Sequence, residues 1–168
     1  MEAALRFLEP RARSSAEVRR RLGSYGYRAD LVESAVERLM DLGVLDDEVF
    51  AREWVRSRDR THPRGERALR SELRTKGVAD QIIDAVFAGR ADANSDAAAA
   101  PDAEENAARR LLERKAGFLR RGGEPRQTRQ RSYGLLMRNG FSSELAWRLA
   151  AELAAPLDDE PPGARRRD

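Results

Sequence analysis

The sequence contains no cysteine, which excludes disulfides, thiolate metal sites and cysteine nucleophiles. Its only histidine, His62, lies in a polar stretch beside Pro63. No second histidine or cysteine is present to complete a metal site with it, and nothing nearby is typical of a nucleophile that it could activate. We therefore expect no catalytic residue, no metal site and no cofactor.

Long apolar runs are also missing. No segment approaches the roughly 18 consecutive apolar residues that a membrane-spanning helix needs. Residues 1–7 lack the basic region and the apolar run that mark a signal peptide. We expect no contact with a membrane and a cytoplasmic location.

Aromatic residues are scarce, at 6%, whereas charged residues reach 36%. The hydrophobic fraction of 40% is enough for a core, but for a thin one. Alanine, leucine, arginine and glutamate dominate over the β-branched residues and tyrosine, which favours helices over sheets. The composition predicts an all-α protein with a highly charged surface.

A repeated pattern runs through the chain. A leucine late in one helix is followed four residues later by a glycine, then by one apolar residue and a second apolar helix. Glycine stops a helix because it adopts the left-handed conformation without strain, and the apolar residue after it can fold back on that helix. Asp30, Asp80 and Ser142-Ser143 offer caps for the next helix. The leucine–glycine pairs are Leu22 and Gly26, Leu73 and Gly77, and Leu136 and Gly140.

A further helix precedes each of these hairpins, over residues 3–8, 46–58 and 104–119. The predicted architecture is three tandem three-helix repeats that form an elongated, curved array. The repeats span residues 1–45, 46–90 and 103–155. Residues 91–102 form a predicted acidic, alanine-rich linker, and residues 156–168 a predicted disordered tail.

The acidic pair Asp46-Asp47 has two interpretations. It could be half of a metal or acid–base site, or it could cap a helix and place an acid in its first turn. Its position just before an apolar-periodic stretch favours the cap.

Basic residues are unevenly distributed. Residues 109–138 contain ten basic and two acidic side chains, although the whole chain has a net charge of only +3. This imbalance indicates a polyanionic or acidic partner, or else an arginine-rich surface that only solvates its helices.

The middle repeat carries a resemblance to a known family. Residues 45–55, Leu-Asp-Asp-Glu-Val-Phe-Ala-Arg-Glu-Trp-Val, and residues 69–78, Leu-Arg-Ser-Glu-Leu-Arg-Thr-Lys-Gly-Val, resemble the motifs of the RecX family. Residues 13–22 of the first repeat resemble the Arg-Ser…Glu-Leu stretch of that family. The third repeat departs most, with Ser132 where the second repeat has Leu69.

The resemblance implies a function. RecX-type proteins are similar three-helix repeat arrays that bind the RecA recombinase and inhibit its filament in DNA repair and recombination. The resemblance therefore implies that the partners of this chain are RecA and the RecA–single-stranded DNA filament. A direct, weak contact with DNA stays open. We expect a monomer that is not an enzyme.

Two basic clusters are candidate partner-binding sites. On one helix, Arg67, Arg70 and Arg74 share a stripe, with Leu69 and Leu73 turned toward the core. Guanidinium groups on one face can grip carboxylates or phosphates. The alternative is a solvated arginine face, partly neutralised by acids on the same helix. The predicted residues are Arg64, Arg67, Arg70, Arg74 and Lys76 in the second repeat, and Arg120, Arg121, Arg126, Arg129 and Arg131 in the third.

Trp147 stands out because the other repeats place Glu33 and Asp84 at its position. It could anchor a partner, but packing under the first helix of its repeat is the interpretation we favour. For the whole chain the alternative to a RecA regulator is a helix-turn-helix-like module that binds DNA directly.

Overall fold

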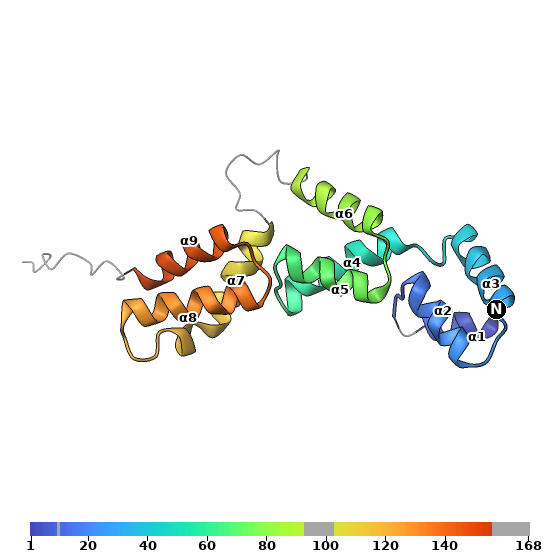
Figure 1. Cartoon of the computed structure of the whole chain (residues 1–168), viewed down its shortest axis with the longest axis horizontal. Helices are drawn as coiled ribbons and strands as arrows, with labels where there is room; N and C mark the ends of the chain where they lie inside the picture. Colours follow the sequence, from blue (N-terminus) through green and yellow to red (C-terminus); the bar gives the residue numbers. More distant parts are fainter. Residues whose placement is uncertain (10, 93–102, 156–168) are drawn as a thin grey trace, which may run out of the picture.

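The computed structural model describes residues 1–9, 11–92 and 103–155, and within these ranges the chain is helical, without a strand (Figure 1). Unit 1 consists of α1 (Glu2–Leu8), α2 (Ser15–Ser24) and α3 (Ala29–Asp41). Unit 2 consists of α4 (Asp47–Thr61), α5 (Glu66–Lys76) and α6 (Asp80–Asp92). Unit 3 consists of α7 (Ala103–Leu119), α8 (Pro125–Arg138) and α9 (Ser143–Ala154). The units follow one another in an elongated row, which confirms the predicted all-α array of three-helix repeats.

Each unit has its own hydrophobic core. The first helix of each unit contributes a fully buried alanine at an equivalent place, Ala4, Ala51 or Ala108, and α7 buries Ala107 as well; the second helix contributes the repeat leucine. A small side chain at that position lets the first helix approach the hairpin closely. Leu69 and Leu73 are fully buried, as the stripe analysis predicted.

The repeat glycines end the second helices as expected. Gly26, Gly77 and Gly140 have φ values of 81°, 82° and 83°. In each unit the N–H of the residue after the glycine donates to the carbonyl of the repeat leucine, at 3.4, 3.1 and 3.2 Å. Val78 and Phe141 are buried, but Tyr27 is 49% exposed and does not fold back into the core. Its ring instead meets that of Tyr25 edge to face, with ring centroids 6.5 Å apart.

The helix caps agree with the sequence only in part. Asp46 caps α4 by accepting from the backbone of Glu48 and Val49, and Ser142 caps α9. The acids at 30 and 80 do not serve as the predicted caps. Asp30 lies inside the first turn of α3 and Asp80 begins α6, and both pair with arginines outside their helices.

The predicted linker and tail fall mostly outside the described residues. Helix α6 extends to Asp92 and α7 begins at Ala103, so residues 93–102 of the linker lie outside the described part. The predicted tail, residues 156–168, lies outside it altogether.

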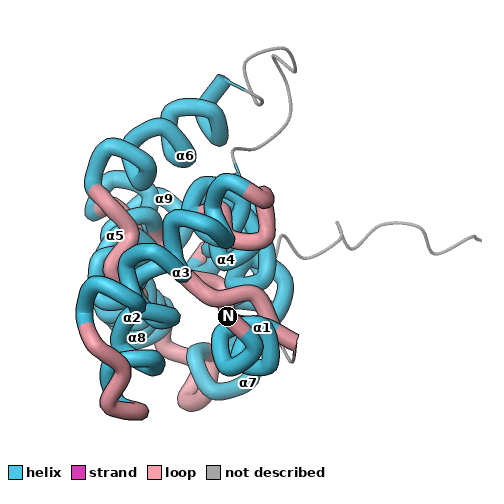
Figure 2. The backbone as a smooth tube through the Cα atoms, turned by 90° about the vertical axis from the view of Figure 1, so that its right-hand side faces the viewer, coloured by secondary structure: helices cyan, strands magenta, loops and turns pink. Residues whose placement is uncertain are grey.

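The second helices of the three units lie end to end. The left-handed glycine after α5, Gly77, lies against Ala16 at the start of α2, and Gly140 after α8 lies against Ala68 at the start of α5. The order along the row is therefore α8, α5 and α2 (Figure 1). Seen along the row, these three helices occupy the same side of the molecule (Figure 2).

Candidate partner-binding surface

The junction between units 1 and 2 joins the end of α5 to the start of α2. Ser14 Oγ donates to the Lys76 carbonyl at 2.6 Å, and the Asp47 carboxylate accepts from the Ser15 N–H at 2.8 Å and from Ser15 Oγ at 2.6 Å. Lys76 Nζ pairs with Glu17 at 2.8 Å. Burial raises the pKa of Glu17, but hydrogen bonds from Lys76 and from the Ser14 backbone outweigh it and leave that pKa below its usual value.

The junction between units 2 and 3 repeats this design. The Gly65 N–H donates to the Asn139 carbonyl at 2.9 Å, and the Glu66 N–H donates to the Glu104 carboxylate at 2.9 Å. Counted from the repeat leucines, Gly65 and Glu66 occupy the positions of Ser14 and Ser15. In both junctions a carboxylate from the next unit's first helix covers the N-terminus of a second helix, where the helix dipole favours negative charge.

The predicted arginine stripe of α5 is engaged inside the molecule. Arg70 pairs with both Glu66 and Asp84, and its side chain is 24% exposed. Arg74 pairs with Asp80 at 2.6 Å. The hydrogen bonds from Arg70 to Glu66 and Asp84 raise the pKa of Arg70, and they outweigh burial, which lowers that pKa. A partner that binds these guanidiniums must compete with carboxylates already in place.

Three more of the predicted residues lie at the junctions. Arg64 Nη1 donates to Asn139 Oδ1 at 3.1 Å, and Arg67 Nη2 donates to the Met137 carbonyl at 3.3 Å. Lys76 belongs to the other junction. The structure thus brings Arg64 and Arg67 to one end of α5 and Lys76 to the opposite end.

The second predicted cluster is more open. Arg131 donates to the Arg121 carbonyl and to Gln127, which holds the turn before α8 in place. Three arginines of the cluster are exposed, and within the described residues their side chains form no ion pair; they are Arg120, Arg121 and Arg126.

The second and third helices of each unit face one another at equivalent positions. Arg19 pairs with Glu33 in unit 1, and Arg70 pairs with Asp84 in unit 2. In unit 3 the equivalent residues are aromatic and meet edge to face, with ring centroids 6.1 Å apart; they are Tyr133 and Trp147.

The favoured interpretation of Trp147, packing under α7, is wrong. The side chain is 57% exposed, and its contacts are to Tyr133 and Arg129 of α8. Sequence spacing aligned Trp147 with Glu33 and Asp84 of the other repeats. It could not tell that α8, and not α7, lies beside this position of α9.

Charge is segregated between the helices. The second helices carry a basic excess: α2 has three basic residues and one acid, α5 four and two, and α8 four and none. The third helices are acidic in balance, with four acids and one base in α3, three and one in α6, and two and one in α9. Because α8, α5 and α2 lie end to end, the basic residues form a row along the molecule.

An ion-pair network holds unit 3 together, and the sequence analysis missed it. Glu105 of α7 pairs with Arg109 at 2.7 Å and with Arg148 of α9 at 2.7 Å, and both arginines also reach Glu152. The hydrogen bond from Arg148 lowers the pKa of Glu105 to about 2, with help from Arg109 and against the effect of burial. The i, i+4 spacing of Glu105 and Arg109 was a visible signal, whereas the partnership with Arg148 was not.

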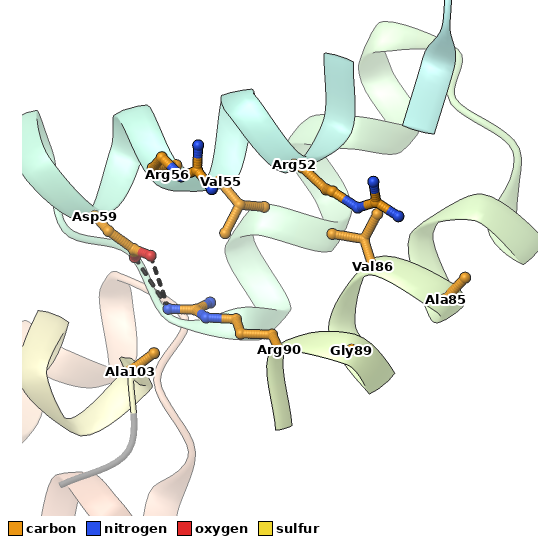
Figure 3. A pocket seen from close by; sticks show the side chains of 9 residues that line it. All are labelled: Arg52, Val55, Arg56, Asp59, Ala85, Val86, Gly89, Arg90 and Ala103. Carbon is orange, nitrogen blue, oxygen red and sulfur yellow. Dashed lines mark hydrogen bonds and ion pairs between the residues drawn. The ribbon is translucent and has the colours of Figure 1, made fainter. Parts of the chain in front are cut away.

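A cavity of about 460 Å³ lies between α4 and α6, beside the start of α7 (Figure 3). Asp59 and Arg90 bond across it at 3.0 Å, and Arg52 and Arg56 line the same side of α4. Burial raises the pKa of Asp59, although the neighbouring Arg90 acts in the opposite direction. The carboxylate is committed to this ion pair, and among the residues lining the cavity no nucleophile accompanies it.

Metal-binding clusters and membrane-spanning helices are both absent from the described residues. These residues contain no group of three or more histidine, cysteine, aspartate or glutamate side chains placed to hold a metal ion. None of the helices in residues 1–9, 11–92 and 103–155 is long and apolar enough to cross a membrane.

Comparisons with known proteins give a consistent result. Residues 1–39, 46–86 and 102–149 match the family models for the first, second and third three-helix domains of RecX. The regulatory protein RecX of Mycobacterium sp. (strain KMS) is 39% identical over 142 residues, 84% of this chain and 74% of the relative. That of Mycobacterium avium (strain 104) is 40% identical over 152 residues, 90% of this chain and 83% of the relative.

Solved structures share the fold. The crystal structure of RecX from Lactobacillus salivarius superposes with a TM-score of 0.74 at 22% identity, covering 90% of this chain and 92% of the other. A second crystal structure of regulatory protein RecX gives 0.70, also at 22% identity, covering 90% of this chain and 72% of the other.

Proposed function

This chain belongs to the RecX family of regulatory proteins, which is not a family of enzymes, and we propose that it binds RecA and the RecA–single-stranded DNA filament and lowers RecA's ATP hydrolysis and strand exchange. In this proposal it acts as a monomer, through contacts rather than chemistry.

The observation that carries the proposal is the row of basic second helices. A filament of protein and DNA is long and carries many phosphates and carboxylates. An elongated array with basic residues along α8, α5 and α2 matches such a partner in both length and charge. Because each unit is placed by its junctions, the basic residues are presented at fixed spacings.

The unpaired arginines are the first contacts to test. Arg120, Arg121 and Arg126 are exposed and have no ion pair with another described residue to give up on binding. Arg70 and Arg74 of α5 remain proposed contacts, but a partner gains less from them because Glu66, Asp80 and Asp84 already pair with their guanidiniums.

The alternative, a helix-turn-helix reader of duplex DNA, has less support. Such modules insert their recognition helix into the major groove, close to the phosphates. The third helices here, which would take that role, each carry more acidic than basic residues. Any direct contact with phosphates falls to the second helices instead.

The test is RecA's DNA-dependent ATPase measured with this protein titrated in. We expect inhibition that saturates, with no ATP hydrolysis by the protein alone. Unchanged RecA turnover at excess would contradict the proposal. Binding of DNA at physiological salt without RecA, together with no effect on RecA, would favour the DNA-binding alternative.

Paired variants locate the interface. Replacing Arg121 and Arg126 by glutamine should weaken inhibition about tenfold or more if both make charge-assisted contacts. The matched control replaces two exposed arginines outside the row, Arg38 of α3 and Arg60 of α4, and should behave like the parent. Equal behaviour of both double variants would place the interface away from the start of α8.

A further inference from the structure

Unit 3 has a pair of aromatic side chains, exposed Trp147 and half-buried Tyr133, where the other units have an ion pair. Tyr133 and Trp147, which replace a cation and a carboxylate, meet at an interplanar angle of 85°. Trp147 is not needed for the core, because α9 buries its apolar side through Leu145, Ala146 and Leu149. In the other units the equivalent position carries a carboxylate that pairs within the fold. A large apolar ring that is 57% exposed at this position indicates a role other than folding.

A guanidinium completes the cluster. Arg129 Cζ lies 3.8 Å from the centroid of the Trp147 ring, within the range of a strong cation–π contact. Its Nε is buried without a hydrogen-bond partner among the described residues. Arg129 is therefore held by the ring, and no carboxylate of the described residues forms an ion pair with it.

The surroundings are charged rather than apolar. In the described part of unit 3, the only other large hydrophobic side chain that is exposed is Phe118. Exposed Arg126 precedes Arg129 by about one turn of α8. A protein partner that inserts an apolar side chain favours a binding surface with a wider apolar patch. A single strand of nucleic acid instead needs an aromatic ring on which a base can stack, beside cationic side chains for its phosphates.

We propose that Trp147, with Tyr133 and Arg129, forms a stacking site for an unpaired base of single-stranded nucleic acid, whose backbone phosphates lie against Arg129 and Arg126. Every base has a π-face, so the site recognises single strands without reading their sequence. Duplex bases are already stacked and cannot enter it. This site is a further function beyond regulation of RecA, and its test contains no RecA, so either proposal can fail alone.

Fluorescence of Trp147 provides a direct readout. The chain has two tryptophans, and the other, Trp54, is half-buried and bonded to Glu72. In a Trp54→Phe variant that retains helical circular dichroism, all tryptophan emission comes from Trp147. Titration with an oligomer of about 16 deoxythymidines should quench this emission with saturation. Emission that stays constant while anisotropy shows the labelled oligomer bound would overturn the proposal.

Affinity measurements with matched variants give the second readout. In the otherwise natural sequence, Trp147→Ala should weaken binding of the oligomer about tenfold, and Trp147→Phe should restore most of it. The control Phe118→Ala removes an equally exposed ring from the same unit and should leave affinity unchanged. An oligouridine arm should respond as the deoxythymidine arm does, and a duplex of equal length should bind no less tightly to Trp147→Ala than to the parent.

Two results would overturn the proposal. One is a Trp147→Ala variant that binds the oligomer as tightly as the parent. The other is a Phe118→Ala control that loses as much affinity for the oligomer as Trp147→Ala does.

Discussion

Gly140 lies so close to Ala68 that a Cβ added to the glycine would come within 2.5 Å of the Ala68 Cβ. The same glycine ends α8 with a φ of 83°. It therefore serves two purposes: it stops one helix and it admits the start of the next helix in the row. Gly77 combines the same two roles against Ala16.

The three repeat glycines form a natural comparison. Gly140→Ala and Gly26→Ala both place a side chain in the left-handed region, at about 1–2 kcal/mol each. Only the first also meets Ala68, whereas no described residue lies within 4 Å of a Cβ at Gly26. We expect Gly140→Ala to lose about 1–3 kcal/mol more than Gly26→Ala in denaturant unfolding. Equal losses would mean that the helix ends are not in contact in solution.

Leu73→Ala tests the core of unit 2. Leu73 is fully buried among side chains from all three helices of its unit. Truncation removes apolar contacts and leaves a cavity, so we expect a loss of about 2–5 kcal/mol in the free energy of unfolding. An unchanged denaturant midpoint would be incompatible with the packing described.

Asp47→Ala tests the junction between units 1 and 2. It removes the acceptor of two hydrogen bonds from Ser15, so the Ser15 N–H at the start of α2 loses its partner. We expect a loss of about 1–3 kcal/mol in unfolding free energy. Asp41→Ala, which removes an exposed acid at the end of α3, is the control and should change stability by about 0.5 kcal/mol or less.

The pH dependence of stability tests the Glu105 network. The pKa of Glu105 is about 2 in the folded chain, below its ordinary value of 4.5. A depressed carboxyl pKa stabilises the fold above the unfolded value, and that stability is lost as pH falls from about 4.5 toward about 2. We expect the parent to lose on the order of 1–3 kcal/mol more than Glu105→Gln across this window.

Comparison with the glutamine variant isolates this carboxyl from others that titrate in the same range. Asp59 has a raised pKa and contributes in the opposite direction, but it is present in both proteins. Parallel stability curves for parent and variant would contradict the network.

Local pattern was enough to predict the elements. The positions of Leu22, Leu73 and Leu136 and of the glycines four residues later predicted three hairpins, because amphipathic spacing and a helix-ending glycine act within about ten residues. The aspartate before α4 was likewise correctly predicted as a cap. Asp30 and Asp80 were predicted as caps from the same kind of signal, but α3 and α6 begin at or before them, so they pair with arginines instead.

The sequence predicted which residues form the candidate surface, but not which of them are paired with other side chains of the molecule. The sequence placed Arg67, Arg70 and Arg74 on one stripe, which geometry alone ensures. It could not tell that Arg70 and Arg74 meet carboxylates of α6, because that depends on the angle between two helices. For the same reason Trp147 was assigned to the packing of α7, although it faces α8.

The sequence by itself determined the helices, the glycine stops after the second helices and the division into three repeats, because those features depend on contacts between near neighbours. The tertiary structure decided how the repeats join and which charges stay free. Asp47 meets Ser15 across 32 positions and Arg64 meets Asn139 across 75. Contacts between residues so far apart in the sequence depend on where whole helices lie. A helix end that bonds to such a distant residue is fixed by the packing of one unit against the next, and not by a local sequence signal.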